Sequence, residues 1–447
     1  MALTGIEIYK MLPQTNCKDC GVPTCLAFAM KLAAGQAELD ACPHVSDEAR
    51  EKLDTASAPP VLPVTIGTGE AAFKAGAETV LFRHEKTFVN QTGIAVLVTD
   101  KMSDGDVDKN LKDFNDLQYD RVGLTLKADL VAVKSETGDA GAFEKLVNKV
   151  KDSAGTMILM SDSVDVLKAG VAAAADKKPL IYAATKDNVE DVGNLAKENK
   201  CPVVAKGNGY DEVIELTTKL TEMGLKEIVI DTGSREMKKV FEENIMIRRA
   251  AIKKTFRPLG FPVINFPCDM TDDSMEEVLI ASTLIAKYSG IVVMSNIEGH
   301  NLFPLLVQRM NIYTDPQRPM ATEQGIYEIG NPDENSPVLI TTNFSLTYFI
   351  VSGEIEGSRV PTWLVVMDTE GLSVLTAWAA GKFVADAIGP FVKKCGIADK
   401  VKHKDLIIPG YSASISGELE EELPDWNIII GPREAAHIPA FLKEKSK

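Results

Sequence analysis

The chain has 447 residues, more than one hydrophobic core usually holds, so we expect two or three domains. Its composition, 45% hydrophobic and 25% charged, is typical of a folded globular protein, and its formal net charge of -16 argues against nucleic acid or anionic membranes as main partners. The sequence shows neither a secretory signal nor eighteen consecutive uncharged apolar residues, so we expect a cytoplasmic protein with reduced cysteines.

Four of the seven cysteines lie in the first tenth of the chain, with the spacing Cys17-x2-Cys20-x4-Cys25-x16-Cys42. Thiolates are the usual ligands of iron–sulfur clusters, and a Cys-x2-Cys pair lets two neighbouring sulfurs reach one cluster from a single loop. Thr24 can cap a helix over 25–34, and the fourth cysteine returns from a separate segment. We predict an iron–sulfur domain over residues 1–57, in which Cys17, Cys20, Cys25 and Cys42 hold a four-iron cluster.

Two other uses of these cysteines stay open. Structural zinc also takes four cysteines, although two matched Cys-x2-Cys pairs are then more common. A redox-active Cys-x-x-Cys pair would leave the other two cysteines without a role. The remaining cysteines, at 201, 268 and 395, lie in apolar surroundings, and we expect them to be buried small side chains.

A Pro-rich stretch over 55–63 is the first predicted linker. After it, short apolar runs alternate with helical patterns such as those at 164–175, 211–223 and 274–287. The predicted strands are 94–99, 130–133, 157–160, 180–183, 202–205, 227–230, 263–266 and 291–294. Eight strands, each followed by a helix, predict a closed parallel (β/α)8 TIM barrel over residues 58–319, although an open doubly wound sheet would show the same alternation.

In such a barrel, catalytic side chains belong at the carboxyl ends of the strands. These positions hold Asp100, Glu136, Asp162, Thr185, Lys206, Asn208, Asp231 and Asn296. The set contains no histidine or cysteine pair and no metal-ligand cluster, and polar residues there, such as Asp162 and Ser234, can equally cap helices. We therefore predict no catalytic residues and interpret the barrel as a scaffold or docking surface.

The alternation breaks over 315–337, where four prolines predict a second linker. Beyond it, strands at 338–341, 363–367, 406–408 and 427–430 alternate with helices near 346–354, 373–387, 412–422 and 434–445. Four such units predict an open α/β sheet of the Rossmann or flavodoxin type over residues 320–447.

The loops that follow these four strands share glycines, hydroxyls and helix starts. Gly371, Gly410 and Gly431 let a large ligand approach the backbone, and helices that begin near Ser373 and Arg433 offer free N–H groups. Ordinary βα loops use the same residue types, but here several consecutive loops share them. Because ligands bind beyond the carboxyl ends of the strands in open α/β sheets, we expect a ligand site at this edge.

Two stretches, Asn16-Cys-Lys-Asp-Cys-Gly-Val-Pro-Thr-Cys25 and Asp368-Thr-Glu-Gly-Leu-Ser-Val-Leu-Thr-Ala-Trp378, carry a resemblance to a known family. With this domain order, the whole chain resembles the large (gamma) subunit of corrinoid iron–sulfur proteins, which serve the reductive acetyl-CoA (Wood–Ljungdahl) pathway of carbon dioxide fixation. The resemblance implies a methyl carrier rather than a stand-alone enzyme. A corrinoid cobalt takes a methyl group from methyltetrahydrofolate through a methyltransferase and delivers it to acetyl-CoA synthase.

The same resemblance implies that the [4Fe-4S] cluster returns oxidised cobalt to Co(I), and that the barrel pairs with a smaller subunit in a heterodimer. It places the corrinoid in the C-terminal domain, where the residues expected to contact it are Thr341, Leu346, Glu370, Gly371, Leu372, Ser373, Thr376, Gly431 and Arg433. The Asp-x-His-x-x-Gly motif, which supplies an axial histidine in many other corrinoid proteins, is absent. Its absence agrees with a base-off corrinoid that has no axial ligand from the protein.

Two other functions stay open. One is a barrel methyltransferase that binds a pterin, with the C-terminal domain as its methyl acceptor. The other is an iron–sulfur electron-transfer protein without a corrinoid.

Overall fold

The computed structural model describes residues 4–33, 37, 39–46, 49–50, 53, 58–121 and 124–445. Contacts divide the chain into two compact units, one made of Met1–Gln118 and Lys127–Tyr313, the other of Tyr119–Leu126 and Thr314–Lys447. The predicted helix end at 34 and the linker start at 55 lie outside the described residues. The domain boundaries at 57/58 and 319/320 stay predictions.

The cysteine-bearing N-terminal module consists of two short helices, α1 (Gly5–Met11) and α2 (Cys25–Ala33), and the turn η1 (Leu39–Ala41). Thr24 starts α2 as predicted, since its hydroxyl accepts a hydrogen bond from the N–H of Ala27 at 3.1 Å. The apolar cluster of the module is small and includes Ile8, Leu12, Val22, Phe28, Val45, Leu53 and the ligand candidates Cys25 and Cys42. A core of this size gains much of its stability from a cross-link such as a metal centre.

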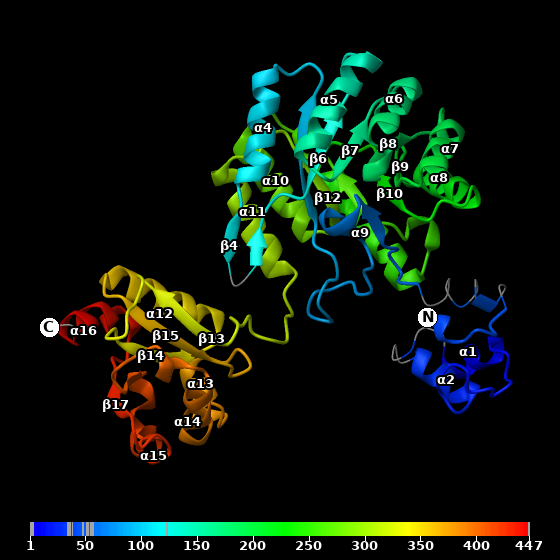
Figure 1. Cartoon of the computed structure of the whole chain (residues 1–447). Helices are drawn as coiled ribbons and strands as arrows, with labels where there is room; N and C mark the ends of the chain where they lie inside the picture. The colour runs from blue at the N-terminus through cyan, green and yellow to red at the C-terminus, as the bar shows by residue number, and fades with distance from the viewer. Residues whose placement is uncertain are drawn as a thin grey trace. The chain divides into compact units, whose positions relative to one another are not determined.

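Eight parallel strands close into a barrel, in the order β3, β6, β7, β8, β9, β10, β11 and β12 around the ring, with helices outside them (Figure 1). The strands are β3 (Gly93–Thr99), β6 (Leu130–Lys134), β7 (Met157–Met160), β8 (Leu180–Ala184), β9 (Val203–Lys206), β10 (Ile228–Asp231), β11 (Val263–Asn265) and β12 (Ser289–Met294). The helices are α4 (Asp104–Asp116), α5 (Ala140–Ser153), α6 (Val164–Ala174), α7 (Val189–Asn199), α8 (Tyr210–Glu222), α9 (Met237–Lys254), α10 (Ser274–Ala286) and α11 (Gly299–Ile312). Each strand lies within two residues of its predicted position, so the barrel prediction is confirmed.

A β-hairpin precedes the barrel and fills its N-terminal end. Its strands are β1 (Val64–Ile66) and β2 (Phe73–Ala75), which pair antiparallel. Val64 and Ile66 are fully buried in the interior cluster of the barrel, beside residues that begin the barrel strands. Packed side chains therefore fill the interior of the barrel from its N-terminal end, as in other closed barrels of this size.

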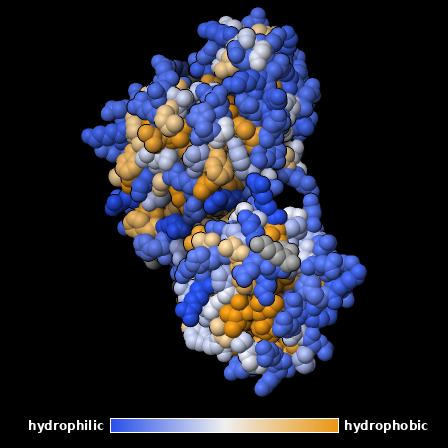
Figure 2. Space-filling view, turned by 90° about the vertical axis from the view of Figure 1, so that its left-hand side faces the viewer, coloured by the Kyte–Doolittle hydropathy of each residue, from blue (hydrophilic) through white to orange (hydrophobic). Residues whose placement is uncertain are grey.

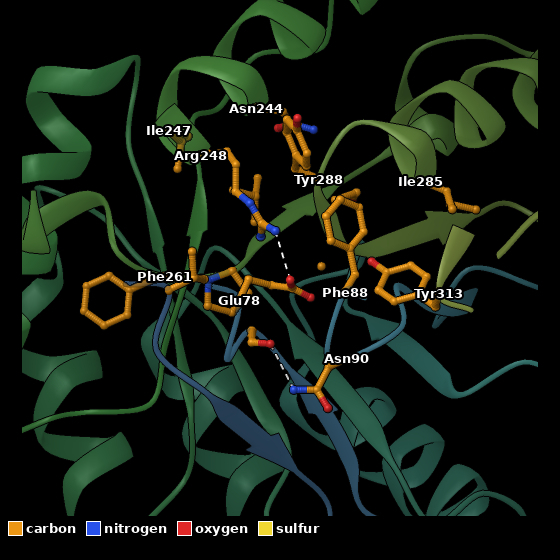
Figure 3. Close-up of a pocket in the computed structure, with 16 residues that line it drawn as sticks. Glu78, Phe88, Asn90, Asn244, Ile247, Arg248, Phe261, Ile285, Tyr288 and Tyr313 are labelled. Atoms are coloured by element: carbon orange, nitrogen blue, oxygen red, sulfur yellow. Dashed lines mark hydrogen bonds and ion pairs between the residues drawn. The ribbon is translucent and has the colours of Figure 1, made fainter. Parts of the chain in front are cut away.

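A buried ion pair lies near the start of β12 (Figure 3). Arg248 of α9 contacts Glu78 at 2.9 Å, and each side chain is only 7% exposed. The guanidinium also donates to the carbonyl of Val80 at 2.8 Å and lies over the rings of Phe88 and Tyr288. The cavity beside it measures about 30 Å³, room for a water molecule and no ligand, so this pair anchors the segment before the barrel and is structural.

The C-terminal unit contains a five-stranded sheet in the order β13-β15-β14-β16-β17. β14 (Val338–Thr342), β15 (Thr362–Met367), β16 (Asp405–Ile408) and β17 (Asn427–Ile430) are parallel and coincide with the four predicted strands. The helices are α12 (Ser345–Ser358), α13 (Val374–Ala379), α14 (Ala385–Lys394), α15 (Ser416–Glu422) and α16 (Ile438–Lys445). In this sheet β15 lies on one side of β14, and β16 lies on the other side. This is the flavodoxin-like strand order.

Two details of the C-terminal prediction are wrong. The stretch interpreted as a linker contains β13 (Gly325–Ile329), which pairs antiparallel with β15 at the sheet edge. The helix predicted over 373–387 is split into α13 and α14, and Gly381 lies in the break with φ of 70°. Among the described residues, no helix is long and apolar enough to cross a bilayer.

A second hairpin, β4 (Tyr119–Arg121) and β5 (Leu124–Leu126), emerges from the connection between α4 and β6. Although it is surrounded in sequence by barrel elements, its contacts place it in the C-terminal unit. The guanidinium carbon of Arg121 lies 5.2 Å from the centre of the Phe349 ring on α12, within the range of a cation–π interaction. The C-terminal unit is therefore assembled from two separate stretches of chain.

Candidate functional site

The loop that carries Cys17 and Cys20 has an unusual backbone. Gln14, Asn16 and Lys18 all adopt left-handed conformations, with φ of 57°, 51° and 70°. Left-handed residues at alternating positions turn neighbouring N–H groups to the same side, which is how backbone nests hold anionic groups, iron–sulfur clusters included. Such conformations are unfavourable for non-glycine residues and persist where the surroundings require them.

Asn16 fastens this loop to the start of α2. Its N–H donates to the sulfur of Cys25 at 3.4 Å, and its side-chain oxygen accepts from the N–H of Cys25 at 2.8 Å. N–H groups aimed at a ligating sulfur stabilise the thiolate form that a metal needs. Asn16 was not among the residues singled out from the sequence, although it directly precedes the first cysteine.

The four predicted ligands come together in one module, and all are free thiols, with Cys17 exposed, Cys20 half-buried, and Cys25 and Cys42 buried. Within the described residues, no three of these sulfurs lie within 4.8 Å of one another. A single zinc ion with bonds of about 2.3 Å would hold its sulfurs about 3.8 Å apart. In either centre these four thiols would be the ligands, and four thiols in one module fit an iron–sulfur cluster.

Asp19 and His44 form the exposed side of this module. The Nε2 atom of His44 lies 2.6 Å from the carboxylate of Asp19, and one ligand atom from each, with the sulfur of Cys17, falls within 4.8 Å of the others. The hydrogen bond from His44, and then that from Cys17, lowers the pKa of Asp19. Neither residue had a role in the sequence prediction.

The mouth of the barrel is occupied by side chains that pair with one another. The hydroxyl of Tyr182 donates to Asp231 at 2.6 Å, and Arg235 forms a bidentate ion pair with the same carboxylate. Arg235 also reaches Asp269 at 3.1 Å and lies over the ring of Phe266, 4.5 Å from its centre. Burial, and then the charge of Asp231, raises the pKa of Tyr182 well above its ordinary value, so this hydroxyl keeps its proton.

Other strand-end residues of the barrel hold loops. Asp100 accepts four hydrogen bonds from the side chains and N–H groups of 135–137. The N-cap positions of α6 and α9 fall on Ser163 and Glu236, so Asp162 and Ser234 do not cap these helices. The interpretation of the barrel as a scaffold stays a prediction.

The carboxyl edge of the C-terminal sheet has the geometry of a ligand site. The chain reverses its strand order between β14 and β16, and at such a point the two following loops leave in opposite directions and open a crevice. A cavity of about 270 Å³ lies here, lined by the ends of β14 and β16, by α12, and by the loop after β17. Its walls are mostly apolar, as in pockets that hold organic cofactors.

Several hydroxyls at this edge are buried without a hydrogen-bond partner. They belong to Thr341, Thr342, Ser345 and Ser412, each at most 3% exposed. Buried polar atoms in folded proteins are nearly always paired, because an unpaired one costs about 1–3 kcal/mol. Of these four residues only Thr341 lines the cavity, so its hydroxyl indicates a polar ligand that completes its hydrogen bond.

Asn343 organises the loop after β15. Its side-chain oxygen accepts hydrogen bonds from the N–H groups of Thr369 and Gly371, both at 3.0 Å, and its side-chain nitrogen donates to Asp368 at 2.9 Å. The side chain is only 4% exposed. One buried amide therefore sets the shape of the 368–371 turn, which contains two of the predicted contact residues, Glu370 and Gly371.

The structure brings three predicted corrinoid contacts, Thr341, Gly431 and Arg433, together as cavity-lining residues. A side chain at 431 would lie 2.9 Å from the carbonyl of Ile408, so glycine lets the loop after β17 pack closely against the end of β16. Leu346 is 58% exposed in the first turn of α12, beside the cavity wall formed by that helix.

The other predicted contacts lie in the loop before α13 and do not line the cavity. Glu370 and Gly371 are left-handed, with φ of 58° and 74°, and Glu370 pairs with Lys382. Leu372 packs against the hydrophobic core. Ser373 is the N-cap residue of α13, and its hydroxyl lies 3.0 Å from that of Thr376.

Sequence reasoning missed several residues of this edge: Asn343, Ser345, Ile350, Tyr411 and Ser412. The loops that contain Asn343 and Ser412 were noted, but loop composition alone did not separate a side chain that faces a cavity from one that caps a helix.

Comparison with known proteins agrees with this architecture. Residues 63–442 match the family described as CO dehydrogenase/acetyl-CoA synthase delta subunit, and residues 12–44 match an Fe-S cluster family. The chain is 47% identical over 444 residues to the corrinoid/iron-sulfur protein large subunit of Moorella thermoacetica, covering 99% of each chain. The chain belongs to this family of large subunits.

More distant relatives in the family are archaeal. The chain is 37% identical to the acetyl-CoA decarbonylase/synthase complex subunit gamma 1 of Methanosarcina thermophila, over 98% of each chain. It is 36% identical to the gamma subunit of the same complex from Methanopyrus kandleri, over 99% of this chain and 98% of that one. The resemblance inferred from the cysteine motif and the C-terminal loop is thereby confirmed.

Proposed function

We propose that the chain is a methyl carrier of the reductive acetyl-CoA pathway. It holds a corrinoid at the carboxyl edge of the C-terminal sheet and a [4Fe-4S] cluster on Cys17, Cys20, Cys25 and Cys42. The observation that carries the proposal is the set of buried, unpartnered hydroxyls at that edge. The printed name of the Moorella relative, which includes both corrinoid and iron–sulfur, supports the same pair of cofactors.

The C-terminal edge fits a corrinoid in size and chemistry. A cavity of about 270 Å³ takes a ring-sized part of such a ligand, not the whole of it. Exposed apolar side chains surround the opening and offer a surface for the macrocycle: Leu346, Ile350, Leu375, Trp378 and Tyr411 are each more than 40% exposed. Figure 2 shows hydrophobic side chains gathered on a face of this unit. An amide side chain of a corrinoid can complete the hydrogen bond of Thr341, which lines the cavity.

Of the two histidines of the C-terminal unit, His437 lies between the cavity-lining residues Ala435 and Ile438, whereas His403 lies away from this edge. His403 precedes β16 and so lies at the opposite end of the sheet, where its ring contacts the carbonyl of Ser336 at 2.9 Å. Because the Asp-x-His-x-x-Gly motif is absent from the sequence, we propose a base-off corrinoid without an axial ligand from the protein. When bound, it supplies a cobalt that accepts a methyl group from methyltetrahydrofolate through a methyltransferase and releases it to acetyl-CoA synthase.

The protein's own part in this chemistry is to hold the corrinoid and to present it to the partner proteins. Asn343 fixes the loop of 368–371, while Gly410 and Gly431 let the loops after β16 and β17 pack closely together. The N-terminal module, residues 1–57 in our proposal, contributes a cluster that supplies single electrons to return oxidised cobalt to Co(I). The relatives are named as a large subunit and as subunits of a complex, which supports a heterodimer with a small subunit and docking to acetyl-CoA synthase.

Metal analysis with an ultraviolet–visible spectrum of the anaerobically purified chain tests the proposal. We expect one cobalt and about four irons per chain, with cobamide absorption bands. Iron without cobalt, in protein made by a host supplied with cobamide, would refute the corrinoid assignment and favour an electron-transfer protein.

Two variants separate the roles of the cofactors. Cys20→Ala should destroy the cluster but leave methyl transfer from pre-reduced protein intact; an equal loss of transfer would disprove the reactivation role. Removal of residues 320–447 should abolish cobamide binding. Methyl transfer from methyltetrahydrofolate by the purified chain alone would support the pterin-dependent barrel methyltransferase instead, which the mutually paired side chains at the barrel mouth disfavour.

A further inference from the structure

The cysteine module places one ionised side chain next to its most exposed sulfur. Asp19, His44 and Cys17 have ligand atoms within 4.8 Å of one another. Among the described residues, the carboxylate of Asp19 has an ion-pair contact only with His44, at 2.6 Å, and no lysine or arginine neutralises it. The contacts of the other cysteines are of different kinds: the sulfur of Cys20 lies 4.0 Å from the carbonyl of Val22, Cys25 receives an N–H from Asn16, and Cys42 is buried in the apolar cluster.

Charge next to a ligating sulfur changes how easily a cluster is reduced. Reduction adds one electron, and thus one negative charge, to the cluster and its thiolates, without a proton or a change in ligands. N–H donors to the sulfurs stabilise the added charge, whereas a nearby carboxylate opposes it. Asp19 is half-exposed, so water weakens its influence without removing it.

We propose that Asp19, which His44 holds beside Cys17, lowers the reduction potential of the cluster. Asp19 acts on the cluster by its charge, and His44 is a positioning residue that acts through Asp19. The inference deepens the proposed function, because a cluster that gives up its electron more readily is a stronger reductant for cobalt. It does not depend on the corrinoid, since the cluster's potential can be measured in full-length protein whether or not cobalt is bound.

The test is a reductive titration of the full-length chain at one near-neutral pH. Dithionite and redox mediators supply the electrons, and electron paramagnetic resonance follows the reduced cluster. Asp19→Asn removes the charge and keeps the shape, so the potential should shift upward, and the ratio of reduced to oxidised cluster at a fixed potential should rise about three- to ten-fold. As the matched control, Asp152→Asn removes the same charge from an exposed position on α5 and should leave the potential unchanged.

A double-mutant cycle tests the role of His44. His44→Ala frees the carboxylate to turn away from the sulfur, so the potential should rise by less than in Asp19→Asn, and this rise should vanish in the Asp19→Asn background. An unchanged potential in Asp19→Asn with full iron content would overturn the proposal. A loss of iron in that variant would overturn it too, since Asp19 would then serve cluster assembly. An equal effect of His44→Ala in both backgrounds would show that His44 does not act through Asp19.

Discussion

Replacing Asn343 by alanine should destabilise the C-terminal unit far more than its single amide group indicates. The substitution leaves the N–H groups of Thr369 and Gly371 without their acceptor, and both residues are buried. An unsatisfied buried N–H costs about 1–3 kcal/mol, so the two together lower the free energy of unfolding by about 2–6 kcal/mol. Water can reach the neighbouring Asp368, which is exposed, so we expect a value near the lower end, about 3 kcal/mol.

Tryptophan fluorescence during urea unfolding measures this effect selectively. All three tryptophans of the chain, at 363, 378 and 426, belong to the C-terminal unit. With a slope of about 1–3 kcal/mol per molar urea, the midpoint should fall by at least about 1 M. Asn427→Ala is the matched control, since this exposed amide makes a hydrogen bond to Asp405 and its loss should cost less than about 0.5 kcal/mol. A midpoint shift no larger than that of the control would refute the reasoning.

Three further predictions concern other buried groups. Thr341→Val should leave the cofactor-free chain at least as stable as before, because a methyl group replaces an unpartnered hydroxyl. Its affinity for cobamide, measured by equilibrium dialysis, should fall about ten-fold, and an unchanged affinity would contradict the proposed site. Glu78→Ala leaves Arg248 buried and unpaired, so thermal unfolding followed by circular dichroism should show a loss of about 3–5 kcal/mol in the barrel, with C-terminal tryptophan fluorescence unaffected. Burial raises the pKa of Glu277 above its ordinary value of 4.5. The contribution of this group to the free energy of unfolding is therefore fully present below pH 4.5, and it is lost as the pH rises through the raised pKa. Barrel stability should therefore fall less with rising pH in Glu277→Gln than in the wild type, whereas Glu276→Gln, at the exposed neighbour, should leave the slope unchanged.

The sequence predicts the strands well because of how parallel sheets are buried. Every barrel strand is covered on both faces and reads as a short apolar run, which flanking turn residues delimit. β13 breaks this rule: it is a half-exposed edge strand, Gly-Ile-Tyr-Glu-Ile, within a proline-rich stretch, so it resembles a linker. The break between α13 and α14 was signalled by Gly381, but a single glycine inside an otherwise helical pattern is often tolerated.

The two cofactor sites differ in how far local sequence defines them. The cysteine site depends on spacing within one short module, so the motif predicts its ligands directly. The C-terminal edge is built from four loops that are distant in sequence. The site residues there are of the same types as ordinary loop residues and differ from them only in where their side chains point. Asn343 and Ser412 could equally have capped helices, and only their burial and their contacts distinguish them.

The hairpin of β4 and β5 also affects how the protein is made. Arg121 and Phe349 are roughly 230 residues apart in the chain. At ribosomal speeds of about 5–20 residues per second, the hairpin emerges about 10–50 seconds before its partner helix exists. During that interval the hairpin lacks the helix that it contacts, and its two strand edges, which pair with no other strand, are a risk for misassociation. Strands of only three residues, with Asp120 and Arg121 in β4, present a short and charged edge that resists pairing with other chains until the C-terminal unit is complete.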